Sequence, residues 1–213
     1  KNGGNPEFKL QSNKEDGLSI SYYCFNMLNP LFQKKEIRKA FNLAIDREKI
    51  TKYSLHGEAE AALHGLVPGL RNSNGFKVKG FDYNPDLARK MLANAGYPNG
   101  KGFPELELDI SESNYLSAIV AEAIQKMLKD NLGINVSVNY QTLSSQMDKF
   151  TNAKSDFWGM IWLADYPDPQ NFLQLFNGAM VPGDSEASYT NASRYINPIF
   201  DQFYSDAIHT QSK

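Results

Sequence analysis

The segment Phe157–Leu163, with the sequence FWGMIWL, is followed directly by Ala164–Pro169, with the sequence ADYPDP. Seven apolar or small residues without polar alternation predict a β-strand that is buried on both faces. Proline fixes its own φ angle and cannot donate a ladder hydrogen bond, so the strand is expected to end at these prolines. The helical spacing of residues 170–176 predicts a helix directly afterwards. Open α/β sheets place their ligand crevice at the carboxyl ends of such strands, so this turn is the candidate site.

Upstream of this strand the chain alternates between predicted strands and predicted helices. Alternating apolar residues predict the strands, and apolar stripes at helical spacing predict the helices: strands at residues 106–110 and 134–140, helices at 115–131 and 142–150. With the strand at 157–163 they form a βαβαβ unit, whose strands are expected to be parallel and whose crossovers right-handed. The three carboxyl ends then share one edge of the sheet with Asp165.

The remaining segments are expected to flank this unit in an α/β fold. The same patterns and cap signals predict a strand at 18–25, helices at 34–45, 47–55 (capped by Asp46), 85–95 and 195–208, loops at 57–80 and 178–193, and a loose lead-in at 1–16.

The composition argues against several classes of function. The 213 residues are 41% hydrophobic and have a net charge of -2. This balance gives no electrostatic reason to expect nucleic acid, which attracts clustered lysine and arginine. No apolar run approaches the roughly 20 residues of a membrane-spanning helix. The N-terminal residues lack the pattern of a signal peptide, so the chain is expected to be cytosolic, or a processed or cut piece.

The usual motifs of metal and nucleophilic chemistry are not found in the sequence. His56, His64 and His209 have no acid or thiol at ligand spacing, so no metal site is expected. The nucleophile elbow of hydrolases and the glycine-rich phosphate and dinucleotide loops are missing, so no cofactor is expected. Cys24 is a lone cysteine inside a predicted strand, and we interpret it as a buried, inert thiol.

Asp165 and Asp168 are paired acids at the candidate site, and several interpretations of them remain open. Their separation in a proline-fixed turn is too small to straddle a sugar bond. A calcium site with Asn171 would lack the alternation and the central glycine of a calcium loop. Asp168 precedes a proline, as the N-cap of a helix does. Asp165 lies between Trp162 and Tyr166, so it is expected to be partly desolvated and to need a cationic partner, such as a ligand ammonium group.

Four segments, in order along the chain, resemble one protein family. They are WLADYPDP at Trp162–Pro169 with NFL at Asn171–Leu173, YYCFN at Tyr22–Asn26 with KEIRKAF and AIDR within Lys35–Arg47, YNPDLARKML at Tyr83–Leu92 followed by AGYP, and AEAIQ at Ala121–Gln125 followed by GINV at Gly133–Val136. Each segment is weak alone. Together they resemble the family 5 extracellular solute-binding proteins, the oligopeptide- and dipeptide-binding receptors of ABC importers.

The resemblance implies a periplasmic-binding-protein-like lobe, with a mixed sheet built on the βαβαβ unit and flanking helices. In the family this region is the C-terminal lobe, which closes over a ligand against an N-terminal lobe of the same parent chain. Residues 1–213 are therefore expected to be a single lobe without its partner lobe, signal peptide or lipid-bearing cysteine. The parent is expected in the periplasm or outside the cell, free or anchored by a lipid, and to work with the membrane subunits of an importer.

The resemblance also implies ligand-binding residues. Asp165 matches the aspartate that pairs with the α-ammonium group of a peptide, and Trp162 matches an aromatic residue that lines the pocket. Leu163 and Ala164 match positions whose backbone groups meet an extended ligand. Tyr166 belongs to the same motif.

Three further positions bear on the ligand. Tyr22 and Tyr23 fall where aromatic residues of the family approach the cleft. Some oligopeptide receptors have an arginine where this chain has Gly159. Recognition of a ligand carboxylate is therefore left open, and so is the ligand class, because the family also includes receptors for nickel and sugars.

The sequence thus predicts a lobe that binds a peptide or another small solute and has no catalytic residues. Two alternatives belong to other classes of protein. One is the effector-sensing domain of a transcriptional regulator built on the same lobe, and the other is a hydrolase that uses Asp165 and Asp168.

Overall fold

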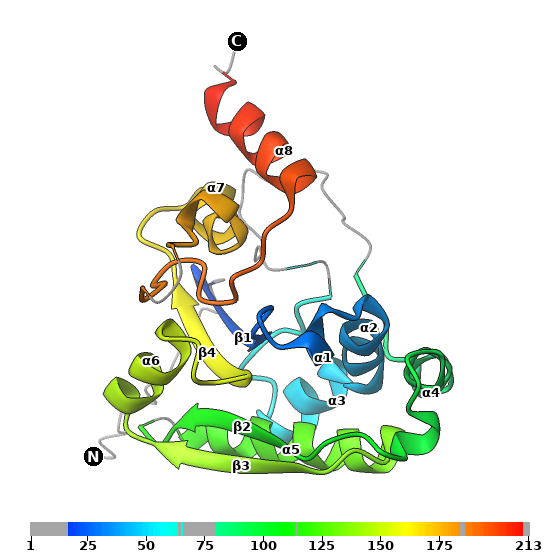
Figure 1. The fold of residues 1–213 in the computed structure, drawn as a ribbon. Coiled ribbons are helices and arrows are strands. Elements are labelled where there is room, and N and C mark those ends of the chain that lie inside the picture. Colours follow the sequence, from blue (N-terminus) through cyan, green and yellow to red (C-terminus); the bar gives the residue numbers. More distant parts are fainter. Residues whose placement is uncertain (1–16, 64, 66–79, 114, 184–185, 211–213) are drawn as a thin grey trace, which may run out of the picture.

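The computed structural model describes residues 17–63, 65, 80–113, 115–183 and 186–210 (Figure 1). Within them, one sheet has four strands in the order β1 (Ser19–Phe25), β4 (Phe157–Leu163), β2 (Leu106–Ser111) and β3 (Val136–Gln141). β1 runs antiparallel to β4, whereas β2 runs parallel to both β4 and β3. The sheet is therefore mixed, as expected for the fold class.

Helices flank the sheet, and they lie close to their predicted positions except for a short helix at Pro30–Gln33, which was not predicted. They are α1 (Pro30–Gln33), α2 (Lys35–Ala44), α3 (Arg47–Lys49), α4 (Pro85–Asn94), α5 (Tyr115–Leu132), α6 (Leu143–Thr151), α7 (Pro169–Leu173) and α8 (Pro198–His209). The predicted cap is present, since the Asp46 carboxylate accepts the Lys49 N–H at 2.9 Å. The helix predicted at 47–55 is divided into α3 and a π-helical turn at Ile50–Ser54.

The predicted βαβαβ unit is present and consists of β2, α5, β3, α6 and β4. The chain steps from β2 out to β3 and then back past β2 to β4, so crossovers of one hand put α5 and α6 on opposite faces of the sheet. The larger core lies between the sheet and α2, α4 and α5, and it includes the buried residues Leu108, Ile124 and Leu128. On the α6 side, the rings of Phe150 and Trp158 stack with centroids 5.6 Å apart.

β4 is buried on both faces only where it begins. Phe157 packs into the larger core and Trp158 packs against α6, and each is 1% exposed. Ile161 and Leu163 are 42% and 70% exposed. The prediction of a fully buried strand is therefore wrong for its second half. The reason is that β2 pairs with β4 only between Asp109 and Trp158, and α5 packs against β2 and β3.

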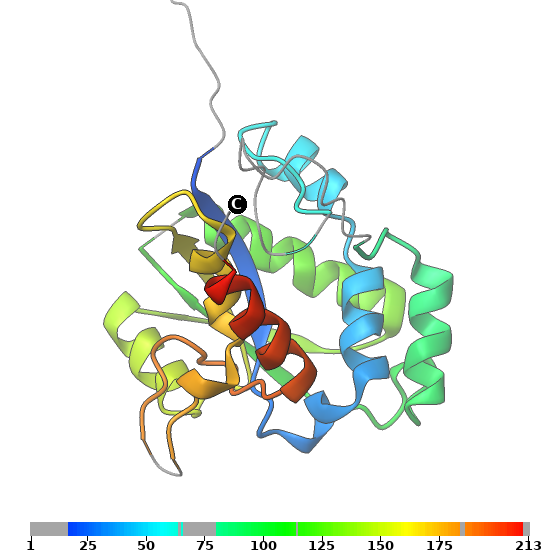
Figure 2. The same cartoon turned by 90° about the horizontal axis from the view of Figure 1, so that it is seen from above.

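α8 extends away from the sheet and contacts the rest of the protein near α7 (Figures 1 and 2). In the described part of the chain, no helix is long and apolar enough to cross a lipid bilayer. The predicted lead-in at 1–16 and much of the predicted loop at 57–80 lie outside the described residues. Residues 57–63 contain neither helix nor strand, as predicted.

Candidate functional site

One face of the β1–β4 pair changes from covered to open along its length. The residue pairs on this face are Phe25–Phe157, Tyr23–Gly159, Ser21–Ile161 and Ser19–Leu163. The Phe25 and Phe157 rings stack inside the larger core, with centroids 5.0 Å apart. The two serines are exposed, like Ile161 and Leu163. The carboxyl end of β4 therefore presents an open, uncharged surface.

β4 also has an unpaired edge near its carboxyl end. The Ala164 N–H donates to the Leu18 carbonyl at 2.8 Å, and only alternate residues of an antiparallel strand bond to the same neighbour. Ile161 and Leu163 therefore direct their N–H and C=O groups away from β1. Among the described residues no strand lies on that side, since β2 meets β4 only at Trp158. Of the two backbone positions implied by the resemblance, Leu163 faces the open edge, whereas the N–H of Ala164 is already bonded.

Gln146, on α6, bridges β2 and β4 where the two strands separate. Its side chain is buried, and its Nε2 atom donates to the Asp109 carbonyl at 3.1 Å and to the Gly159 carbonyl at 2.6 Å. One backbone acceptor on each strand is thereby satisfied. Sequence analysis missed this residue, because no pattern distinguishes it from the other polar residues of its helix.

On the opposite face, the carboxyl end of β4 packs against α7. Ile20, Ala164 and Phe172 form a small buried cluster, and Tyr22 and Trp162 pack against it. Phe172 belongs to α7 and is 0% exposed, so it anchors the turn to the sheet. The structure thus brings Tyr22 to the same cluster as Trp162.

Tyr22 and Tyr23 point to opposite faces of the sheet, as successive strand residues do. Tyr23 packs against the larger core, where its ring centroid lies 6.3 Å from that of Phe157. Tyr23 is therefore separated from Trp162 and shares a face with Gly159. Burial raises the pKa of both phenols above its ordinary value.

Asp165 is joined to Trp162 through Asn171. The indole N–H of Trp162 donates to Asn171 Oδ1 at 3.0 Å, and Asn171 Nδ2 donates to Asp165 Oδ2 at 3.5 Å. Asn171 is 1% exposed. The sequence suggested Asn171 only as an oxygen ligand for calcium, because a contact across a turn leaves no periodic signal.

Asp165 is exposed, so the prediction that it is partly desolvated is wrong. Tyr166 does not bury it, because the Tyr166 hydroxyl donates to Gln170 Oε1 and the residue is 45% exposed. Asp165 takes part in none of the ion pairs formed within the described residues. Its carboxylate is therefore open to a cation from outside.

Asp168 is engaged in the local structure. Its Oδ1 atom accepts the Gln170 N–H at 2.7 Å, which confirms it as the N-cap of α7. Over the ranges that the structure describes, no three His, Cys, Asp or Glu side chains gather closely enough to hold a metal ion.

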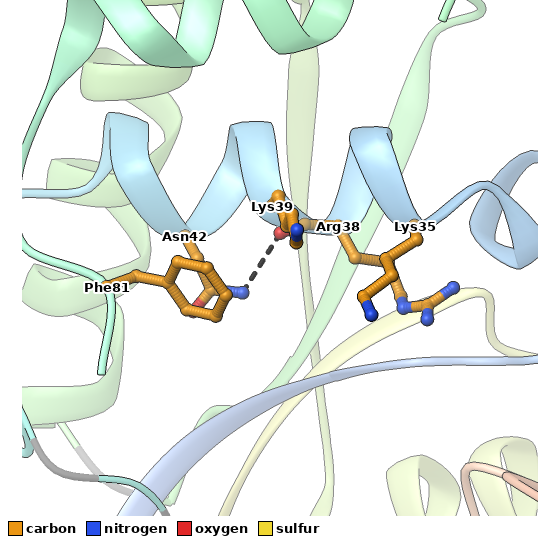
Figure 3. A pocket seen from close by; sticks show the side chains of 5 residues that line it. All are labelled: Lys35, Arg38, Lys39, Asn42 and Phe81. Carbon is orange, nitrogen blue, oxygen red and sulfur yellow. Dashed lines mark hydrogen bonds between the residues drawn. The ribbon is translucent and has the colours of Figure 1, made fainter. Parts of the chain in front are cut away.

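A shallow hollow lies along α2 (Figure 3). Its volume is about 170 Å³, and its lining residues are Lys35, Arg38, Lys39, Asn42 and Phe81. Four of them recur at helical spacing on the solvated face of α2, and the Asn42 amide donates to the Arg38 carbonyl at 2.9 Å. None of them lies on β1, β4 or α7. We interpret the hollow as the polar face of an amphipathic helix.

The chain is similar to known binding proteins. It is 29% identical to Heme-binding protein A of Haemophilus influenzae, over 96% of this chain and 36% of that protein. It is 30% identical to Dipeptide-binding protein DppE of Bacillus subtilis, over 90% of this chain and 35% of that protein. The chain therefore spans about a third of the length of these relatives.

The fold is similar to that of solved binding proteins. A periplasmic oligopeptide-binding protein from Borrelia burgdorferi matches with a TM-score of 0.76 and 28% identity, over 91% of this chain and 37% of that chain. This likeness confirms the predicted α/β fold class with its mixed sheet. The family model described as bacterial extracellular solute-binding proteins, family 5 Middle, matches residues 3–181. The chain belongs to the family 5 bacterial extracellular solute-binding proteins.

Proposed function

We propose that this chain is the C-terminal lobe of the substrate-binding protein of an ABC-type importer, and that a peptide or another small solute binds at the end of β4. The observation that supports this most is the exposed carboxylate of Asp165 next to a strand edge without a partner among the described residues. A carboxylate recognises an ammonium group, and a free strand edge recognises extended main chain of any sequence. The two features together fit the amino terminus of a peptide.

The ligand would lie along the edge formed by Ile161 and Leu163. Their N–H and C=O groups would pair with the ligand backbone, while the ligand ammonium group reaches Asp165. Trp162 would contribute an aromatic wall, held in place by Asn171. Main-chain pairing of this kind tolerates many ligand side chains.

Affinity would depend on closure of a second lobe. Asp165 is exposed in this lobe, and a charge pair in water is weak because the dielectric constant is high. Covering the site excludes water and strengthens the pair. We therefore expect the N-terminal lobe of the parent chain to be needed for tight binding, and the isolated lobe to bind weakly.

The proposed receptor would act in the periplasm or outside the cell, free or anchored by a lipid, with the membrane subunits of an importer as partners. The relatives are named for heme and for dipeptides, so a peptide remains one of several ligand classes. We propose no catalysis, and Asp168 serves as a helix cap. The relatives support neither a regulator's sensing domain nor a hydrolase using Asp165 and Asp168.

The test is binding by the full-length receptor encoded by the parent gene. Native mass spectrometry of the purified receptor is expected to show a bound peptide or small amine that is released on unfolding. Isothermal titration calorimetry with alanine peptides of three to five residues is expected to give binding. A receptor that is purified empty and binds none of these peptides would contradict the proposal of a peptide receptor.

A further inference from the structure

The amide of Asn171 lies between two residues of the proposed ligand site. The indole of Trp162 lies 3.0 Å from its oxygen, and the carboxylate of Asp165 lies 3.5 Å from its nitrogen. Asn171 is 1% exposed, whereas Asp165 is exposed. A buried polar side chain with both ends engaged is a fixed support for a carboxylate that would otherwise rotate freely in water.

The chemistry of the two neighbours sets the orientation of this amide. An indole N–H can only donate, and an ionised carboxylate can only accept. The Asn171 oxygen must therefore face Trp162, and its NH₂ group must face Asp165. The reversed amide would lose the hydrogen bond to the indole and would place its oxygen against a negative charge.

The backbone of Asn171 is held as firmly as its side chain. Its N–H donates to the Asp168 carbonyl at 3.1 Å, and its carbonyl accepts the Gln174 side-chain amide at 3.0 Å. The next residue, Phe172, is 0% exposed in the cluster beneath the turn. The amide is therefore fixed to the sheet and not to a loose part of the turn.

We propose that Asn171 is a positioning residue of the ligand site, which holds the indole of Trp162 and the carboxylate of Asp165 in one arrangement. This inference rests on the proposed function, because it assigns Asp165 to a ligand ammonium group. Asn171 contacts one oxygen of the Asp165 carboxylate, whose remaining acceptor sites could meet the ligand. The aromatic wall and the charge then meet the ligand as a single rigid unit.

The first test needs no ligand. The full-length receptor is labelled with ¹⁵N-tryptophan, and the Trp162 indole resonance is assigned with Trp162→Phe. Removal of the charge in Asp165→Asn is expected to shift this resonance at neutral pH, because Asn171 transmits the change. The same substitution is expected to leave the resonance unmoved in the Asn171→Leu background, and Asp168→Asn alone is expected not to move it. A resonance that Asp165→Asn does not move would overturn the inference even if Asn171→Leu does not fold, and so would an equal shift in the Asn171→Leu background.

The second test measures selectivity for an amino terminus. The probes are tri-alanine and N-acetyl-tri-alanine, and the readout is the ratio of their affinities for the full-length receptor. Asn171→Leu is expected to lower this ratio about tenfold, the size of one charge-assisted hydrogen bond. Asp168→Ala is the matched control, because it removes the side-chain cap of the same helix without changing the side-chain amide of Asn171. An unchanged ratio in folded Asn171→Leu would overturn the inference.

The two proposals can fail separately. If Asp165→Asn leaves the affinity ratio unchanged, the charge pair of the proposed function is wrong. If Asp165→Asn lowers the ratio but Asn171→Leu does not, only the positioning role is wrong. If the receptor binds neither probe, the resonance of Trp162 decides the role of Asn171.

Discussion

The ring of Tyr23 lies over Gly159, its partner on the neighbouring strand, so closely that a Cβ atom at position 159 would be 2.7 Å from Tyr23 Cε1. This contact marks the point where the β1–β4 face changes from covered to open. An arginine at position 159 would have to displace the Tyr23 ring. A cation for a ligand carboxylate is therefore not expected from this position.

Gly159→Ala is expected to destabilise the protein by about 1–3 kcal/mol, because the added methyl group meets an aromatic ring in a packed region. The measurement is urea unfolding of the chain, followed by circular dichroism. Tyr23→Leu in the same chain is the control, since the smaller side chain leaves room for the methyl group. In the Tyr23→Leu background, Gly159→Ala is expected to cost less. Equal costs in both backgrounds would show that the ring is not the cause.

Lys149→Met is expected to lower the free energy of unfolding by about 3 kcal/mol. The Lys149 ammonium group lies 2.8 Å from the buried carboxylate of Asp109, and its loss leaves that charge without a cation. Lys126→Met is the matched control, because the Lys126–Asp130 pair is exposed and its loss should cost less than about 0.5 kcal/mol. Similar losses in the two variants would contradict this assignment.

Because of the Lys149–Asp109 ion pair, the stability of the chain is expected to depend on pH in the alkaline range. The hydrogen bond to Asp109 raises the pKa of Lys149 above its usual value. A pKa raised in the folded state stabilises fully below the unfolded value of about 10.4, and the contribution is lost as pH rises through the folded value. The difference in unfolding free energy between the wild type and Lys149→Met is therefore expected to stay constant to about pH 10 and to shrink above it. An unfolding free-energy difference that grows above about pH 10 would contradict a raised pKa of Lys149 in the folded chain.

The thiol of Cys24 is expected to be unreactive in the folded chain. Burial raises its pKa to about 12, so very little thiolate exists at pH 8. Its reaction with Ellman's reagent at pH 8 is expected to be at least about a hundredfold slower in buffer than in denaturing urea. Rapid reaction of the folded chain would show that the thiol is accessible and activated.

The sequence was sufficient for the elements whose signals are local. The alternating strands, the apolar helix stripes and the caps at Asp46 and Asp168 lie where their patterns place them. The second half of β4 was misjudged because Ile161 and Leu163 are as apolar as any core residue. Their exposure depends on where β2 leaves β4, which no pattern within the strand records.

The candidate site was only partly accessible from sequence. A motif around Asp165 located the turn, but the exposure of Asp165 and the placement of Tyr22 and Tyr23 on opposite faces follow from tertiary packing. Asn171 and Gln146 each make two side-chain hydrogen bonds to residues outside their own helices. Such contacts have no period, so only a structure shows them.

The central claim is that Asp165 binds the ammonium group of a ligand, and a double-mutant cycle in the full-length receptor tests it most directly. Calorimetry would compare wild type and Asp165→Asn, each with a tight-binding peptide and with the same peptide acetylated at its amino terminus. Removing either charge is expected to weaken binding by about 2 kcal/mol or more, and removing the second is expected to add little further loss. Losses that simply add, or an Asp165→Asn receptor that binds the free peptide as tightly as the wild type, would contradict the account.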